Sequence, residues 1–300
     1  MADSAYFSAY FSSFVLFPMA SPLTLGLTLG YSPCPNDTFI FYALMHGKIP
    51  LQHIQLSPPV LEDVETLNQW TLHTRLDVTK ISFHALGYLQ DTYTMLNAGA
   101  ALGRGCGPLL ITRPDQLTAP SSWKIAIPGK YTTAALLLKL FLPEHGELFV
   151  LPFDTILEAI QEGRVDAGVI IHESRFTYQN YGLVCVQDLG EWWEKETMLP
   201  IPLGCIAAKK ELGQQTIQEV EQAIAASLDW AFAHPDACTE YIRQHAQEMD
   251  KQVIADHIEL YVNDFSLDLT SIGRAAVHEL LRRGKKAGMF TSSAAFNKAS

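Results

Sequence analysis

The order of strand-like and helix-like segments is the feature that most limits how this chain can fold. Such segments alternate up to about residue 210, and only helical segments follow. Alternation of this kind is typical of α/β proteins, in which helices cover a largely parallel sheet. We therefore expect an α/β protein whose helical C-terminal region packs on the sheets and adds no strand. The expected C-terminal helices run from about Thr216 to Ala233, Ala237 to Glu248, Lys251 to Val262 and Ser271 to Ala287.

The length of the chain favours two lobes, because 300 residues exceed what one hydrophobic core usually organises. Spaced glycines at Gly103–Pro108 precede the strand-like run Leu109–Thr112, whereas a dinucleotide-binding loop would precede a helix. We interpret these glycines as one crossing between lobes and Pro200–Ala207 as the return, with a ligand-binding cleft between the lobes. The predicted division is an N-terminal extension at 1–22, expected to be poorly ordered, a larger lobe of 23–110 and 208–300, and a smaller lobe of 111–207.

A polar, proline-containing run at residues 32–38, Ser-Pro-Cys-Pro-Asn-Asp-Thr, separates the strand-like Leu23–Tyr31 from the helix-like Phe39–Met45. The two prolines stiffen this connection. Asn36 and Asp37 supply side-chain oxygens where the first helical N–H groups lack partners. Such a loop at the end of a strand is where open α/β sheets bind ligands, and a simple helix cap is the alternative interpretation.

The same construction recurs at two further strand ends. Ser82 follows a strand-like segment and precedes a helix that begins at Phe83. Thr132 and Thr133 lie between the strand-like Trp123–Ile127 and a helical run. Each break combines hydroxyl groups with helix N–H donors and a favourable helix dipole, which suits a carboxylate or another oxyanion. We expect these breaks to form one site for a small anionic molecule.

A fourth strand end carries the candidate general base. His172 follows the apolar run Ala167–Ile171, whereas most of the other nine histidines occur in polar segments and are expected at the surface. Partial burial would keep the pKa of His172 near or below neutrality, as a general base requires, although a histidine that only caps the strand is the alternative. Strand alternation would turn Glu173 to the opposite face. The group that orients the His172 ring cannot be identified from the sequence.

Two predicted helices precede the Asp-containing strands. Val60–Leu72 is a helix candidate, and Thr155 with Glu158 has the spacing of a capping box at the start of the second. Gly163 would close that second helix.

Composition excludes several classes of function. The formal net charge of -11, with no basic stripe, argues against nucleic-acid binding. The five cysteines form no C-x-x-C pair and no histidine or cysteine cluster has metal-ligand spacing, so we expect no metal site and reduced thiols, as in a cytoplasmic protein. Cys34 is expected to be a buried thiol, with a nucleophile as the alternative.

The N-terminal region leaves one alternative open. Residues 5–20 are apolar, but no Lys or Arg precedes them, and the run is too short to span a bilayer. We expect no membrane span. Whether residues 1–22 are a genuine extension or a cleaved segment stays open at this point.

An ordered set of motifs resembles the 1,4-dihydroxy-6-naphthoate synthase family of the futalosine route to menaquinone. The motifs are Ser-Pro-Cys-Pro-Asn-Asp-Thr-Phe, Asp-Val-Thr-Lys-Ile-Ser, Gly-x-Gly-x-Gly-Pro, Tyr-Thr-Thr-Ala and Ile-Ile-His-Glu, and the resemblance covers about residues 23–290. It implies the two-lobed fold of type II periplasmic binding proteins. It also implies a carbon–carbon lyase that converts cyclic dehypoxanthine futalosine to 1,4-dihydroxy-6-naphthoate without a metal or organic cofactor.

The resemblance also implies roles for individual residues. His172 would be the proton acceptor, and the segments Lys80-Ile81-Ser82 and Thr132-Thr133 would bind the substrate. The sequence run itself adds Asn36 and Asp37 to this set.

Two other functions fit the same fold. A solute-binding protein would bind a small anion without converting it, and the apolar N-terminus gives this alternative some support. The chorismate dehydratase of the same pathway is the other alternative, against which the proline-containing run and the His172 strand argue. The oligomeric state and the extent of lobe closure cannot be predicted from the sequence.

Overall fold

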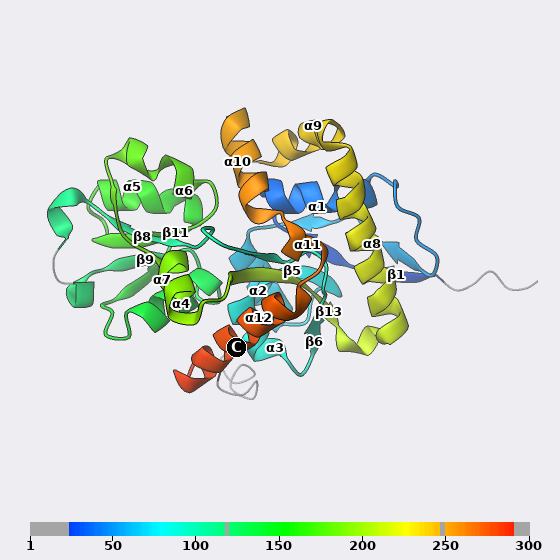
Figure 1. The fold of residues 1–300 in the computed structure, drawn as a ribbon, viewed down its shortest axis with the longest axis horizontal. Helices are drawn as coiled ribbons and strands as arrows, with labels where there is room; N and C mark the ends of the chain where they lie inside the picture. Colours follow the sequence, from blue (N-terminus) through cyan, green and yellow to red (C-terminus); the bar gives the residue numbers. More distant parts are fainter. Residues whose placement is uncertain (1–23, 118–119, 247–249, 291–300) are drawn as a thin grey trace, which may run out of the picture.

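The computed structural model describes residues 24–117, 120–246 and 250–290, and the predicted extension at 1–22 lies outside these ranges. Two mixed sheets form the centres of two lobes, the larger on the right of Figure 1 and the smaller on the left. The larger sheet contains, in spatial order, β4 (Val60–Leu61), β2 (Leu29–Tyr31), β5 (Val78–Ser82), β13 (Ile201–Lys209) and β6 (Tyr93–Met95), with β7 (Ala101–Gly103) also paired to β13. The smaller sheet contains β10 (Leu148–Val150), β9 (Ile125–Ile127), β11 (Ala167–Ile170), β8 (Leu109–Thr112) and β12 (Val184–Asp188).

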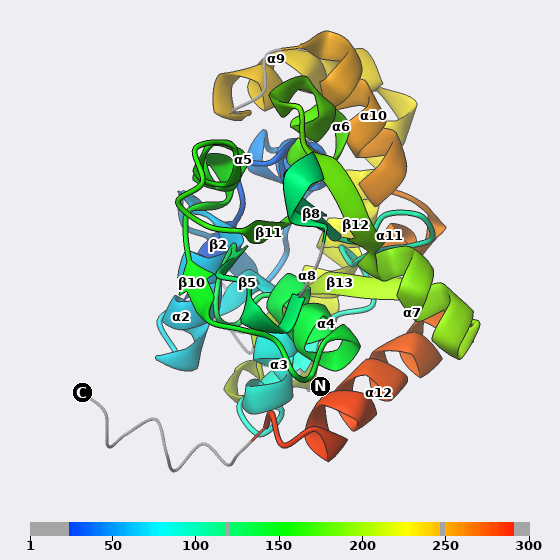
Figure 2. The same cartoon turned by 90° about the vertical axis from the view of Figure 1, so that its left-hand side faces the viewer.

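Helices cover both sheets, as the alternating pattern predicts. Figure 2 shows the smaller lobe from its own side, with its strands between the helices α5 and α4. The larger lobe also holds a parallel pair of strands, β1 (Leu25–Leu27) and β3 (Ile54–Leu56). The first seven helices are α1 (Pro35–Met45), α2 (Val64–Leu72), α3 (Phe83–Leu89), α4 (Thr133–Phe141), α5 (Ile156–Gln161), α6 (Ser174–Thr177) and α7 (Leu189–Thr197).

The C-terminal region is helical, as predicted. Its helix α8 packs along α1, and α12 contacts both α3 of the larger lobe and α4 of the smaller lobe. One buried hydrophobic cluster accordingly contains residues of β5, α12 and α4, and it joins the two lobes. The helices of this region are α8 (Gln214–Ala233), α9 (Pro235–His245), α10 (Lys251–Tyr261), α11 (Asp264–Leu267) and α12 (Thr270–Lys286).

The structure corrects the predicted starts of three helices. The helix expected from Phe39 begins at Pro35, because proline is well tolerated in the first helical turn. The segment Val60–Leu72 is not one helix, since β4 precedes α2 and Asp63 caps α2 by accepting from two backbone N–H groups. The predicted capping box is absent, because Thr155 donates its hydroxyl to the Pro152 carbonyl instead.

The chain crosses between the two sheets twice. The chain leaves the larger sheet after β7 and enters the smaller sheet at β8, so the glycine-rich segment spans the two. On the return, β13 pairs with the larger sheet from Ile201 onward. The predicted boundary between residues 207 and 208 therefore lies inside a strand of the larger lobe, and the return crossing precedes Ile201.

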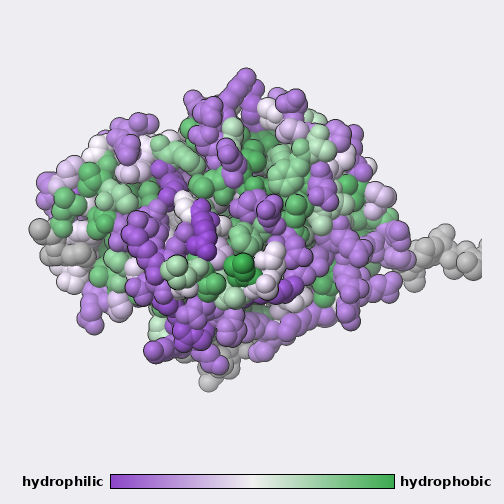
Figure 3. Space-filling model, viewed as in Figure 1, coloured by the Kyte–Doolittle hydropathy of each residue, from purple (hydrophilic) through white to green (hydrophobic). Residues whose placement is uncertain are grey.

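On the face shown in Figure 3, hydrophilic residues lie over both lobes, with hydrophobic residues between them. Among the helices that the structure describes, none is long and apolar enough to cross a bilayer.

Candidate active site

A cavity lies between the lobes, where the ends of strands from both sheets meet. Its volume of about 90 Å³ is several times the roughly 10–15 Å³ that one water molecule needs, so it has room for a small ligand. Ser32 follows β2 and Ser82 ends β5 in the larger lobe, whereas Thr132 follows β9 and His172 follows β11 in the smaller lobe. In each lobe these two strands run parallel, so their carboxyl ends lie at the same edge, as in other ligand-binding α/β sheets.

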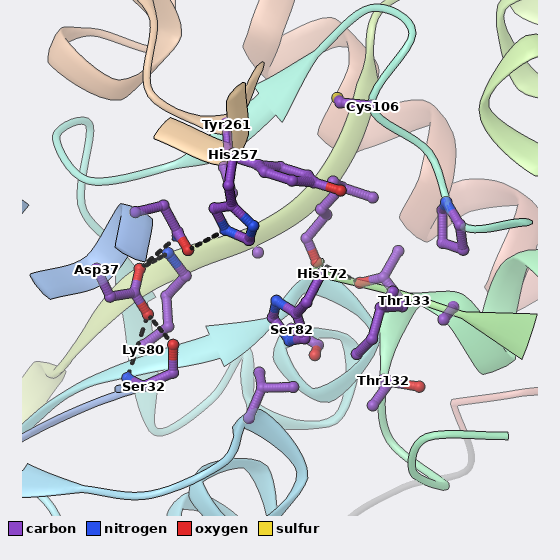
Figure 4. A pocket seen from close by; sticks show the side chains of 18 residues that line it. Ser32, Asp37, Lys80, Ser82, Cys106, Thr132, Thr133, His172, His257 and Tyr261 are labelled. Atoms are coloured by element: carbon purple, nitrogen blue, oxygen red, sulfur yellow. Dashed lines mark hydrogen bonds and ion pairs between the residues drawn. The ribbon is translucent and has the colours of Figure 1, made fainter. Parts of the chain in front are cut away.

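A buried ion pair forms one wall of the cavity (Figure 4). Lys80 Nζ lies 2.6 Å from Asp37 Oδ1, and both side chains are almost completely buried. The other carboxylate oxygen of Asp37 accepts from the Ser32 backbone N–H at 3.2 Å and from the Ser32 hydroxyl at 2.9 Å. Asp37 therefore does not cap α1, as the sequence suggested, but neutralises Lys80. A well-bonded buried pair of this kind is held in one geometry, because breaking either side leaves a charge without compensation.

Asn36 connects this ion pair to a histidine of the C-terminal region. Its Nδ2 donates to Asp37 Oδ1 at 2.9 Å, and its Oδ1 lies 3.0 Å from Nε2 of His257. His257 is on α10, is fully buried and lines the cavity. Burial lowers the pKa of His257 well below its ordinary value, and the nearby His172 and Lys80 act in the same direction. The imidazole of His257 is therefore neutral.

Ser82 presents a hydroxyl group to the cavity. Asn68 of α2 makes two hydrogen bonds that orient Ser82. The Oδ1 atom of Asn68 accepts from the Ser82 backbone N–H at 2.8 Å, and its Nδ2 donates to Ser82 Oγ at 3.1 Å. Because Oγ acts as an acceptor in that contact, its own proton remains available for a ligand. Asn68 is thus a supporting residue that the sequence did not reveal.

The two threonines differ from the expectation that their hydroxyls bind an anion. Thr132 caps α4 by accepting from the Ala135 N–H, and it donates to the Gly129 carbonyl at 2.8 Å. The Thr133 hydroxyl donates to the Leu203 carbonyl at 2.5 Å. Both hydroxyl protons are therefore committed to the backbone. The Ala135 N–H is therefore occupied, and the N–H groups of Thr133 and Ala134 at the start of α4 remain as donors for an anionic group at this wall.

His172 occupies a backbone conformation that is rare for residues other than glycine, with φ at 56°. Its ring lies edge-on to Phe153, with centroids 5.0 Å apart, and its Nε2 is 4.0 Å from the sulfur of Cys34. Burial lowers the pKa of His172 below its ordinary value, although Glu173 and Asp37 oppose this shift. A neutral imidazole at a strand end can accept a proton at physiological pH.

Ile81 and Glu173, which adjoin Ser82 and His172 in the sequence, do not lie where the sequence predicted. Ile81 is fully buried in the core cluster that joins the lobes, because strand alternation turns it away from the cavity that Lys80 and Ser82 face. Glu173 was expected on the opposite face from His172, but β11 ends at Ile170 and the chain turns at His172. Its carboxylate Oε1 consequently lies 3.7 Å from Nδ1 of His257.

The buried cysteines near the cavity are neutral thiols. Burial raises the pKa of Cys34 well above its ordinary value and the pKa of Cys106 to about 12. Neither thiol has the depressed pKa of a nucleophile, which agrees with the interpretation of Cys34 as a buried thiol. Within the described ranges of the chain, no group of three or more His, Cys, Asp and Glu side chains is arranged to hold a metal ion.

The expectation that most histidines outside His172 lie at the surface is wrong for two of them. His257 and His84 are both buried, and His257 lines the cavity. A signal for His257 exists in the sequence, because it lies three residues after Ile254 and four before Tyr261, on the apolar side of a helix.

Comparison with known proteins connects this site to a family. A family model described as menaquinone biosynthesis matches residues 27–286. A 1,4-dihydroxy-6-naphthoate synthase from Thermus thermophilus is 48% identical over 268 residues, which cover 88% of this chain and 96% of the relative. The synthase of the same name from Streptomyces coelicolor is 44% identical over 268 residues, which cover 86% of this chain and 93% of that relative.

Solved structures agree with the predicted fold. A crystal structure of a protein from Archaeoglobus fulgidus has a TM-score of 0.82 and 36% identity, covering 88% of this chain and 98% of that one. A Candida albicans protein described as having the generic periplasmic binding protein fold has a TM-score of 0.63 and 14% identity, covering 90% and 91%. At that identity the likeness shows the fold alone, and it confirms the predicted periplasmic-binding-protein-like architecture. The sequence matches go further, and this chain belongs to the 1,4-dihydroxy-6-naphthoate synthase family of menaquinone biosynthesis.

Proposed function

We propose that this chain is an enzyme that converts cyclic dehypoxanthine futalosine to 1,4-dihydroxy-6-naphthoate. The relatives at 44–48% identity are named for that product, and the matches span nearly their whole length. The proposed reaction is a carbon–carbon bond cleavage by general-base catalysis, without a metal or organic cofactor.

The observation that carries this proposal is the position of His172 at the cavity. The lowered pKa keeps its imidazole neutral, so it can take a proton from the bound substrate and start the fragmentation. The rare backbone conformation of His172 fits a functional residue, because such conformations persist where the surrounding structure holds them.

We assign the other groups that line the cavity to parts of the substrate by the hydrogen bonds that each can make. The N-terminus of α4 offers backbone N–H donors for the substrate carboxylate, and the free hydroxyl proton of Ser82 suits a carbonyl or hydroxyl oxygen. Lys80 is already neutralised by Asp37, so we assign it to positioning Asp37 and Asn36 and not to pairing with the substrate. Enclosure between the lobes excludes water and strengthens these hydrogen bonds.

The test is to incubate the purified protein with cyclic dehypoxanthine futalosine and to follow the products by mass spectrometry. Formation of dihydroxynaphthoate at a rate proportional to protein concentration is the expected result. Substrate that is bound by the folded protein but recovered unchanged would refute the proposed activity and favour a solute-binding function.

A further inference from the structure

His257 carries an unpaired nitrogen that faces the cavity. The side chain is fully buried on α10, and its Nδ1 has no hydrogen-bond partner among the residues that the structure describes. The carboxylate oxygen Oε1 of Glu173 is 3.7 Å from this nitrogen, beyond hydrogen-bond distance. Because a buried polar atom without a partner destabilises the protein, such an atom in a ligand cavity calls for an explanation.

The hydrogen bonds around Asn36 determine which nitrogen of His257 carries the proton. Both Asp37 carboxylate oxygens act as acceptors, so Asn36 must turn its NH₂ group toward Asp37 and its oxygen toward His257. The Asn36 oxygen can only accept, and His257 Nε2 therefore donates to it across 3.0 Å. A neutral imidazole with its proton on Nε2 has a lone pair on Nδ1, which is a hydrogen-bond acceptor.

We propose that His257 is a further substrate-binding residue whose Nδ1 accepts a hydrogen bond from a hydroxyl group of the enclosed ligand. The chain from Lys80 through Asp37 and Asn36 to His257 fixes the tautomer in advance, so the acceptor is formed before the ligand arrives. This inference rests on the proposed function for the identity of the ligand, a polyhydroxylated carboxylate.

The position of His257 relative to His172 supports this role. The two rings are nearly parallel, at 14°, with centroids 6.1 Å apart, and one comes from each lobe (Figure 4). A ligand that gives a proton to His172 therefore lies within reach of Nδ1 of His257, so the larger lobe contributes an acceptor opposite the proposed base.

The direct test is nitrogen-15 NMR on the full chain labelled at histidine. In the free protein His257 is expected as the neutral tautomer with its proton on Nε2, and the Nδ1 resonance is expected to shift when cyclic dehypoxanthine futalosine is added. His84 is the internal control, because it is also buried but outside the cavity, and its Nδ1 lies 3.0 Å from the Thr132 carbonyl, which fixes the opposite tautomer. An Nδ1 resonance of His257 that stays unchanged at saturating ligand would overturn the proposal.

The variant His257→Gln provides a kinetic test. Glutamine can keep a donor near the Nε2 position for Asn36 but has no acceptor at the Nδ1 position. We expect kcat/KM to fall about 10- to 30-fold, as for loss of one hydrogen bond to a ligand. Wild-type kinetics in this variant would contradict the role, and if the variant does not fold, the NMR titration of the wild-type protein decides. Binding with an Nδ1 shift but no product would refute the proposed reaction and retain the hydrogen bond.

Discussion

The carboxylate of Glu65 connects the two lobes, and its removal should weaken their closure. Glu65 lies on α2 of the larger lobe and is only 6% exposed. Its two oxygens accept from the backbone N–H groups of Lys130 and Tyr131, each at 3.0 Å, in the segment between β9 and α4 of the smaller lobe.

The expected effect of Glu65→Ala follows from these two bonds. Each hydrogen bond to a charged group contributes about 1.5–3 kcal/mol. Burial raises the pKa of Glu65, so desolvation of the carboxylate offsets part of this gain. A net loss of about 1.5–3 kcal/mol of closure free energy would lower the apparent affinity for substrate roughly 10- to 150-fold.

The assay is KM for the substrate, together with the radius of gyration of the ligand-free protein by small-angle X-ray scattering. Both should increase in Glu65→Ala. Gly129→Ala is a matched variant from the other lobe, because a Cβ at this position would clash with Glu65 Oε2 and push the carboxylate out of place. Wild-type KM and radius of gyration in both variants would refute the argument that Glu65 holds the lobes together.

Two further predictions concern charge. Asp37→Asn leaves Lys80 buried without its partner and should lower the free energy of unfolding by about 3–5 kcal/mol in urea denaturation, and an unchanged midpoint and slope would contradict the assigned ion pair. The pKa of His172 is lowered from its ordinary value of 6.5, so its basic form persists to lower pH and the acid limb of kcat/KM should fall below pH 6.5. The same shift should make the protein lose stability as pH falls below 6.5, because the unfolded chain then binds a proton that the folded state does not. An acid limb at or above pH 6.5 would be inconsistent with a buried neutral base.

The elements of the fold were largely predictable because their patterns are local. The C-terminal helices have apolar residues at helical spacing, and the positions of Ser82, Thr132 and His172 at strand ends follow from where apolar runs stop. The start of α1 was missed because a proline was interpreted as part of a loop, although proline is equally typical of the first helical turn.

The partners within the site were not predictable, because they join residues far apart in the sequence. Lys80 and Asp37 are 43 residues apart and Asn36 and His257 are 221 apart, so only the folded chain shows these contacts. The turn at His172 likewise depends on its positive φ, which strand alternation does not predict, and this placed Glu173 on the wrong side.

The measurement that tests the central claim most directly compares His172→Asn with the wild-type protein. Asparagine tolerates the left-handed backbone at this position better than alanine, so the fold should be retained, as circular dichroism can verify. If His172 is the general base, the variant should still bind cyclic dehypoxanthine futalosine but form dihydroxynaphthoate on the order of 10²-fold more slowly or worse. Product formation at nearly the wild-type rate would contradict the account.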